Sequence, residues 1–161
     1  MIYIIEGPDG AGKTTLVEQI RKSNYNAVVK HFGAPQTPEE ADNYYKVYAK
    51  AINDMHSDSE VLIFDRSWYS DMVYGPVMRN RQEMTQEHAD MLSAMVVARG
   101  GGIIIYCTAP IKVLWSRCQR RGETYLQNQA QLQAIAVGYS KVMAENVRFL
   151  PVVRYDTAAR W

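Results

Sequence analysis

The chain has 161 residues and is 47% hydrophobic, a length and composition that predict one domain over residues 1–161 with a substantial core. Its formal net charge of +1 argues against a large basic surface for duplex nucleic acid, and no stretch is apolar for long enough to cross a bilayer. Cys107 and Cys118 have no metal-ligand spacing, so we expect a cytoplasmic protein with reduced thiols.

Short apolar strands alternate with helices along the chain. The predicted strands span residues 1–5, 26–30, 60–64, 103–107 and 152–155. The predicted helices span residues 12–22, 38–55, 67–77, 86–99, 110–120 and most of 123–149, the third of them ending near Gly75-Pro76. This alternation indicates parallel pairing. We therefore expect a three-layer α/β fold, an open parallel sheet of about five strands with helices on both faces and ligands at the carboxyl ends of the strands.

The turn after the first predicted strand carries the most informative motif. Residues 7–14 read GPDGAGKT, which is G-x-x-x-x-G-K-[ST] between a predicted strand and a predicted helix. Such a loop surrounds phosphate with backbone N–H groups, while its lysine reaches the β- and γ-phosphates and its Thr14 hydroxyl binds Mg²⁺. The ligands predicted are ATP and Mg²⁺. The residues expected to bind them are Gly7, Asp9, Gly10, Ala11, Gly12, Lys13, Thr14 and Thr15.

A second polar pair, Asp65 and Arg66, directly follows the apolar run VLIF. An acid at this strand end can hold Mg²⁺ opposite Thr14, and the adjacent arginine presents a fork of donors that suits a phosphate. The alternative is an ion pair at the end of a strand, or a helix cap. The P-loop elsewhere in the chain favours the metal and phosphate interpretation.

Three segments in order, GPDGAGKTT, DRSWYSDMVYG and RCQRRGE, resemble the thymidylate kinases and the wider P-loop kinases of nucleotides and deoxynucleosides. The resemblance implies ATP- and Mg²⁺-dependent phosphorylation of a deoxynucleoside monophosphate, with dTMP or a modified pyrimidine nucleotide as the leading acceptor. The chain is short for a thymidylate kinase. Compact members are typical of bacteriophages, and such a protein would act in the cytoplasm of the host cell.

The same resemblance implies residue roles. Asp9 and Arg66 would contact the acceptor, and Arg121 and Arg117 would close over the donor from a lid near residues 117–125. The expected catalytic residues are Lys13, Asp65, Arg66 and Arg121, and the expected metal ligands are Thr14 and Asp65. A solvated basic face is the alternative for the lid arginines.

The acceptor pocket is where the chain departs from the thymidylate kinases. Their T-R-E-P-G-G motif is replaced by HFGAPQT at residues 31–37, so we expect a different base pocket. The residues expected to bind the acceptor are Asp9, Tyr44, Tyr48, Arg66, Trp68, Ser70 and Tyr74. Packing in the core is the alternative for the aromatic members of this set.

Three other functions stay open. A deoxynucleoside kinase would use Asp65 as a general base toward a sugar hydroxyl. A kinase of hydroxymethylated bases in DNA would share the same parts, although the near-neutral charge disfavours it. A non-enzymatic switch of the GTPase kind would need an N-K-x-D tetrad, which the chain lacks. The sequence allows a monomer or a homodimer.

Overall fold

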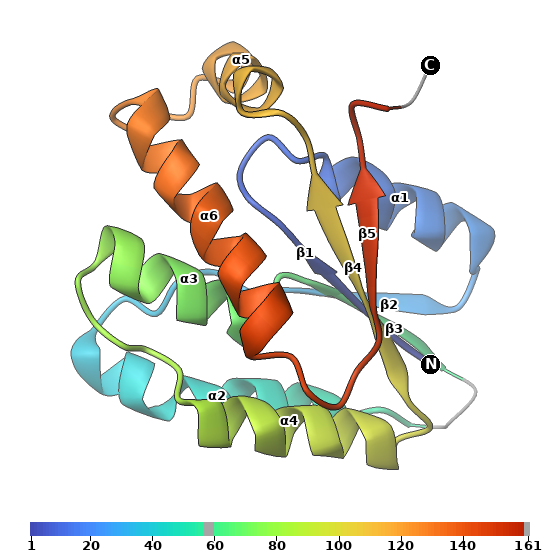
Figure 1. Ribbon diagram of the computed structural model, residues 1–161. Helices are drawn as coiled ribbons and strands as arrows, with labels where there is room; N and C mark the ends of the chain where they lie inside the picture. Colours follow the sequence, from blue (N-terminus) through green and yellow to red (C-terminus); the bar gives the residue numbers. More distant parts are fainter. Residues whose placement is uncertain (57–59, 160–161) are drawn as a thin grey trace.

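Five parallel strands form one sheet in the computed structural model, which describes residues 1–56 and 60–159 (Figure 1). The strands are β1 (Ile2–Glu6), β2 (Ala27–His31), β3 (Val61–Asp65), β4 (Gly102–Thr108) and β5 (Val152–Asp156), and they lie in the order β2-β3-β1-β4-β5. The predicted open parallel sheet is therefore confirmed. The single domain over residues 1–161 stays a prediction, and residues 57–59 and 160–161 lie outside the described residues.

The helices lie close to the predicted positions. They are α1 (Lys13–Ser23), α2 (Pro38–Asn53), α3 (Trp68–Met78), α4 (Gln86–Ala98), α5 (Ile111–Arg121) and α6 (Gln129–Glu145). One predicted helix end was wrong. The third helix continues past Pro76, because a proline in the last turn removes only one helical hydrogen bond. The last helix occupies most of residues 123–149, as predicted, and begins at Gln129, because Asn128 caps it by accepting a hydrogen bond from the Gln131 backbone N–H at 2.8 Å.

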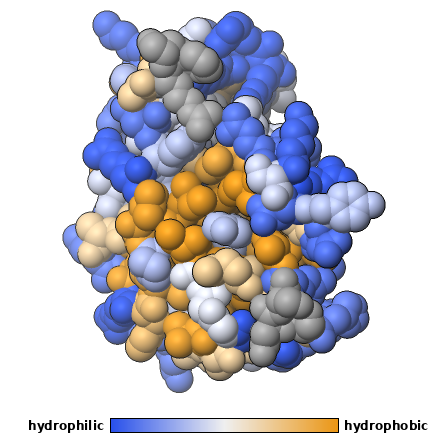
Figure 2. All heavy atoms as spheres, turned by 90° about the vertical axis from the view of Figure 1, so that its right-hand side faces the viewer, coloured by the Kyte–Doolittle hydropathy of each residue, from blue (hydrophilic) through white to orange (hydrophobic). Residues whose placement is uncertain are grey.

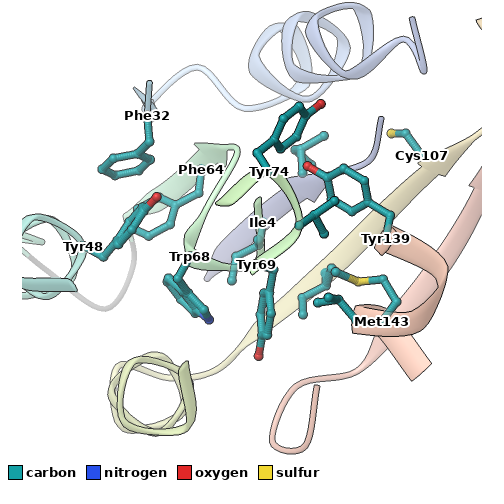
Figure 3. Packing of buried hydrophobic residues seen from close by; sticks show 14 of the residues in the cluster. Ile4, Phe32, Tyr48, Phe64, Trp68, Tyr69, Tyr74, Cys107, Tyr139 and Met143 are labelled. Carbon is teal, nitrogen blue, oxygen red and sulfur yellow. The ribbon is translucent and has the colours of Figure 1, made fainter. Parts of the chain in front are cut away.

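The core lies between the sheet and the helices α2, α3, α4 and α6, which share one side of it in Figure 1. The central strand β1 is buried on both faces, and its Ile4 has no exposed surface. Aromatic rings from three elements meet beside it (Figure 3). The Tyr48 ring centroid lies 4.6 Å from that of Phe32 and 5.7 Å from that of Trp68. This aromatic cluster joins α2 and the start of α3 to the sheet.

Among the helices of the described residues, α1 is the one that covers the opposite face of the sheet (Figure 1). Figure 2 looks at this side and shows hydrophobic residues gathered in the middle of the face. At the edge strand β5, Val152 is 37% and Val153 is 47% exposed. The prediction of helices on both faces thus holds, with one face only partly covered. Within the described residues, no helix combines the length and the apolar character needed to cross a membrane.

Glu6, the last residue of β1, is a fully buried carboxylate that joins three elements. Its Oε1 accepts hydrogen bonds from the Ser67 backbone N–H at 2.8 Å and the Ser67 hydroxyl at 2.7 Å. Its Oε2 accepts from the Ser70 hydroxyl at 2.7 Å and the Tyr139 hydroxyl at 3.2 Å. Burial raises the pKa of Glu6, although the hydrogen bonds from the two serines oppose this. The hydrogen bonds of Glu6 therefore connect β1 to the start of α3 and to α6.

We predict that Glu6→Gln lowers the free energy of unfolding by about 1–3 kcal/mol at pH 7, because an amide nitrogen would replace an acceptor that faces hydroxyl donors. Urea denaturation measures the change. The matched control is Glu18→Gln, which removes an exposed carboxylate 3.8 Å from Arg21 and should change stability by less than about 0.5 kcal/mol. Equal effects of the two substitutions would contradict the structural role of Glu6.

Candidate active site

Three neighbouring cavities open at the carboxyl ends of the strands, where ligands bind in open α/β sheets. The lid cavity (about 440 Å³) lies between Gly12 and the arginines of α5. The P-loop cavity (about 280 Å³) lies between the loop before α1 and the end of β3. The tyrosine cavity (about 300 Å³) is lined by residues that include Tyr48, Tyr74 and Tyr125. The P-loop cavity shares Arg121 with the lid cavity and Arg66 with the tyrosine cavity.

The backbone of the P-loop requires glycine at position 10 and surrounds a buried lysine. Gly10 has φ +77°, and a Cβ at this position would lie 2.5 Å from the Leu114 carbonyl oxygen, so a side chain there meets both strain and contact with backbone. Lys13 is buried, and its Nζ donates to the carbonyl oxygens of Gly7 at 2.6 Å and Pro8 at 2.9 Å. Burial lowers the pKa of Lys13 to about 8, which still leaves most of the ammonium groups charged at pH 7. The loop therefore presents a fixed cation at its centre.

Asp9 and Arg66 form an ion pair across the P-loop cavity. The Arg66 Nη2 lies 2.7 Å from Asp9 Oδ1, and the Tyr74 hydroxyl donates to Asp9 Oδ2 at 2.5 Å. Burial by itself would raise the pKa of Asp9, but the charges of Lys13 and Arg66 outweigh it and hold that pKa below its ordinary value. Arg66 has a left-handed backbone with φ +72°, an unfavourable conformation for a residue with a Cβ. This conformation places the Arg66 guanidinium beside Asp9.

The predicted metal ligands lie on the same cavity. Asp65 ends β3 and Thr14 begins the first turn of α1, and both line the P-loop cavity. The His31 Nδ1 lies 2.9 Å from Asp65 Oδ2, a contact that the sequence did not predict. A carboxylate and a hydroxyl supply the oxygen ligands that Mg²⁺ prefers, together with water and phosphate oxygens. The residues present thus fit a magnesium ion held by Thr14 and Asp65.

The two lid arginines lie in different environments. Arg117 is half-buried and donates to the Gly10 carbonyl oxygen at 3.0 Å and to the Thr157 hydroxyl at 2.8 Å, so it joins the P-loop to the segment after β5. Arg121 is 48% exposed, lies 3.9 Å from Glu123, and lines both the lid cavity and the P-loop cavity. Arg121 is therefore the more exposed cation beside the predicted phosphates.

Of the seven residues predicted to bind the acceptor, Asp9 lines the P-loop cavity, and the other six divide into two groups. Tyr48, Ser70 and Tyr74 line the tyrosine cavity together with Arg66. Trp68 is fully buried in the aromatic cluster and is not part of that lining. Tyr44 is also buried, outside the lining, and its hydroxyl donates to the Gly33 carbonyl oxygen at 2.9 Å. For these two rings, the structure agrees with the alternative of core packing.

Tyr125 and Asp71 are among the residues of these cavities that were not predicted. Tyr125 follows the lid arginines and lines both the tyrosine and the P-loop cavities; its only sequence signal is an aromatic residue in a short loop. Asp71 is buried in the wall of the tyrosine cavity and accepts a hydrogen bond from the Tyr48 hydroxyl at 2.7 Å. Burial raises the pKa of Asp71 to about 7. The signal that could have found Asp71 is its place on α3 one turn after Ser67, in the segment that begins with Asp65 and Arg66.

The fold and these cavities define a P-loop kinase, with cations around a phosphate loop and a second cavity beside it. Residues 1–106 match the model of the polyphosphate kinase 2 (PPK2) family, so the chain belongs to this family of phosphotransferases. A curated relative, the GDP-polyphosphate phosphotransferase of Mycobacterium tuberculosis, is 31% identical over 70 residues. That stretch covers 44% of this chain and only 23% of the relative.

Solved structures support the same fold. The YorR protein from Bacillus subtilis, in complex with phosphorylated GDP, superposes with a TM-score of 0.79 at 20% identity, over 99% of this chain and 87% of that one. PPK2 from Arthrobacter aurescens TC1 gives 0.70 at 17% identity, over 95% and 59% of the two chains. Deoxyadenosine kinase from M. mycoides with bound dATP gives 0.67 at 21% identity, over 99% and 93%. The predicted kinase class is confirmed, and the thymidylate specificity and phage origin stay predictions.

The raised pKa of Asp71 predicts that the free energy of unfolding depends on pH. Its pKa is raised from 3.8 to about 7 on folding, so between these values the folded chain keeps a proton that the unfolded chain releases. The stability contributed by this proton is lost as the pH rises toward 7. Asp71→Asn has no such proton, and we expect its unfolding free energy relative to wild type to rise by about 1–3 kcal/mol between pH 5 and pH 8.

Urea denaturation of both proteins at the two pH values measures this difference. The control is Asp42→Asn, whose carboxylate is 75% exposed and 3.7 Å from Arg81. A stability difference between Asp71→Asn and wild type that does not change with pH would contradict the burial of a titrating Asp71.

Proposed function

We propose that this chain is a Mg²⁺-dependent kinase that transfers a phosphoryl group from a donor in the lid cavity to a nucleoside monophosphate in the tyrosine cavity. The observation that carries the proposal is the position of the P-loop cavity between the other two. It shares Gly12 and Arg121 with the lid cavity, and His31, Arg66 and Tyr125 with the tyrosine cavity. A donor and an acceptor bound from the two sides would therefore meet beside Lys13.

The chemistry of the shared residues favours a phosphate as the attacking group. A monophosphate is already anionic at neutral pH and needs positive charge to hold it, which Arg66 can supply. A sugar hydroxyl needs a general base instead. Asp9 suits that role poorly, because Lys13 and Arg66 outweigh the effect of burial and lower its pKa. Asp65, the base expected for a deoxynucleoside kinase, already contacts His31 at 2.9 Å and is proposed here as a ligand of Mg²⁺. The resemblance of the chain to thymidylate kinases makes dTMP one acceptor to test.

The donor is proposed to be a linear polyphosphate, either the triphosphate of ATP or inorganic polyphosphate. Membership of the PPK2 family and the name of the mycobacterial relative support inorganic polyphosphate. The apolar side chains of Leu16 and Tyr155 in the lid cavity, beside its three arginines, support a donor with a base such as ATP. Both donors place a terminal phosphoryl group next to the P-loop.

The proposed reaction is an in-line displacement. An oxygen of the acceptor phosphate forms a new bond to the terminal phosphorus, and the bond from that phosphorus to the bridging oxygen of the donor breaks. Lys13 and Arg121 would balance the charge on the transferring group, and Arg66 would hold the acceptor. Mg²⁺ bound by Thr14 and Asp65 would neutralise charge on the donor oxygens.

A second candidate is transfer to a nucleoside hydroxyl. It is favoured by the contact of His31 with Asp65, because a histidine oriented by a carboxylate can act as a general base. His31 also lines both the tyrosine cavity and the P-loop cavity. In this case the deoxynucleosides, rather than their monophosphates, would be phosphorylated.

The test supplies Mg²⁺ with ATP or inorganic polyphosphate, offers each of the four standard deoxynucleoside monophosphates, dUMP and their nucleosides, and detects phosphorylated products by chromatography. We expect turnover with monophosphates that falls by about 10²–10³ in Lys13→Ala, because a cation positioned at the transferring group is lost. Chelation of Mg²⁺ should abolish it.

The matched control is Lys22→Ala, in the exposed last turn of α1. It should retain the wild-type rate. Turnover with nucleosides alone would replace the main proposal by the second candidate. Absence of any product, or full activity of Lys13→Ala, would contradict both.

A further inference from the structure

The segment after β5 has no role in the reaction as proposed above, although it is connected to the P-loop. This segment, the loop before α1 and helix α5 lie at the same end of the sheet (Figure 1). Thr157 directly follows the last residue of β5, is buried, and lines the lid cavity together with Gly12 and Arg117. Thr157 therefore lies between the edge of the sheet and the donor side of the P-loop.

The hydroxyl of Thr157 is oriented by hydrogen bonds in both directions. Its Oγ1 donates to the Thr108 carbonyl oxygen at 3.2 Å and accepts from Arg117 Nη1 at 2.8 Å. The Thr157 backbone N–H donates to the same carbonyl oxygen at 2.8 Å, which anchors the residue to the end of β4. A hydroxyl has a single proton, so donation to Thr108 turns a lone pair toward the guanidinium. The Thr157 oxygen is thus fixed as an acceptor for Arg117.

Arg117 connects this anchor to the P-loop. Its Nη1 also donates to the Gly10 carbonyl oxygen at 3.0 Å, and its Nη2 donates to the Thr157 carbonyl oxygen at 3.2 Å. These contacts use three of the five N–H groups of the guanidinium. A planar group held at three points has little freedom to reorient. The Gly10 carbonyl is therefore held in place relative to the end of β4.

The turn of the P-loop that Arg117 contacts depends on support from outside the loop. Gly10 and Gly12 both have left-handed backbones, with φ +77° and +81°, and glycine is the residue with the most conformational freedom to lose. A Cβ at Gly12 would lie 3.4 Å from Thr157 Cγ2, so the threonine methyl lies beside the loop at a second point. Backbone N–H groups bind phosphate well only where they converge on it. Contacts that hold this turn therefore bear on the affinity for the donor.

Arg117 makes these contacts without losing its charge to a carboxylate. Its partners are two carbonyl oxygens and a hydroxyl, and no ion pair of Arg117 is found within residues 1–56 and 60–159. Arg121 differs, because it lies 3.9 Å from Glu123. The positive charge of Arg117 thus remains directed at the lid cavity, while its position is set by neutral groups of the protein.

We propose that Thr157 is a positioning residue for the donor: by orienting Arg117, it holds the Gly10 turn of the P-loop in the conformation that binds the donor phosphates. The effect passes through Arg117, so it requires the hydroxyl at residue 157 and the planar fork at residue 117. This inference rests on the proposed function for the assignment of the lid cavity to the donor. It gives Thr157 no part in binding the acceptor.

The experiment measures the binding of ATP and of tripolyphosphate, each with Mg²⁺ and without acceptor, by calorimetry. It compares wild type with Thr157→Val, which keeps the shape and removes the hydroxyl, and Thr157→Ser, which keeps the hydroxyl. We expect Thr157→Val to bind both donors about 10-fold more weakly, the effect of losing a hydrogen bond to a charged group, and Thr157→Ser to remain close to wild type. In turnover, the KM for the donor should rise in Thr157→Val while the KM for the acceptor stays unchanged.

A second variant separates the fork of Arg117 from its charge. Arg117→Lys keeps the charge and loses the fork, and we expect it to weaken donor binding as much as Thr157→Val does. The double variant should be no weaker than either single one, because both changes break the same connection. The matched control is Arg148→Lys, in which the replaced arginine is 56% exposed and 3.0 Å from Asp90; it should keep the wild-type affinity.

The inference is overturned if Thr157→Val binds the donors as tightly as wild type, or if its affinities for donor and acceptor fall together. It is also overturned if Thr157→Ser is as weak as Thr157→Val, or if Arg117→Lys keeps the wild-type affinity. Weaker donor binding by Thr157→Val, without phosphoryl transfer to any acceptor by wild type, would contradict the proposed function and leave the role of Thr157 standing. Transfer that does not depend on Thr157 would do the reverse.

Discussion

The buried carboxylate of Glu6 sets the geometry on which the candidate site depends. It lies one residue before the P-loop and accepts hydrogen bonds from Ser67 and Ser70 of the α3 region and from Tyr139 of α6. The phosphate loop therefore cannot shift relative to Arg66, which directly precedes Ser67, without breaking a buried hydrogen bond. Since an unpaired buried polar group is costly, this network holds the P-loop and the wall of the tyrosine cavity as one unit.

Around this rigid centre, the charges of the site suit the proposed binding of phosphate from two sides. Lys13 and Arg66 are close enough to Asp9 to lower its pKa despite burial, so the carboxylate stays ionised and keeps Arg66 in place. Arg121 differs in being half-exposed, on the last turn of α5. Buried cations in the centre and a more exposed one at the lid suit a reaction in which charge spreads over the transferring phosphoryl group.

Sequence patterns predicted correctly the features that depend only on residues close to one another in the sequence. The G-x-x-x-x-G-K-[ST] motif, the strand-end position of Asp65 and the alternation of strands and helices depend on spacing alone, and the open parallel sheet and the phosphate loop follow from them. The kinase class was inferred instead from the resemblance of three segments to known kinases. Patterns could not tell that Trp68 is a core residue while its neighbour on α3, Asp71, faces a cavity, because both depend on how α3 rotates against α2 and the sheet. The contacts of Glu6 with Ser70 and Tyr139 link residues 64 and 133 positions apart, which no local pattern reports.

The central claim is that a donor and an acceptor bind on opposite sides of Lys13 and meet in the P-loop cavity. The most direct measurement is the affinity, in the presence of Mg²⁺, of an inhibitor that joins adenosine to a deoxynucleoside through a chain of phosphates, compared with ATP and the deoxynucleoside monophosphate alone. The account predicts that the joined molecule binds more than about 100-fold tighter than ATP, because one ligand then gains the contacts of both cavities without a second loss of translational freedom. An affinity no higher than that of ATP would contradict it.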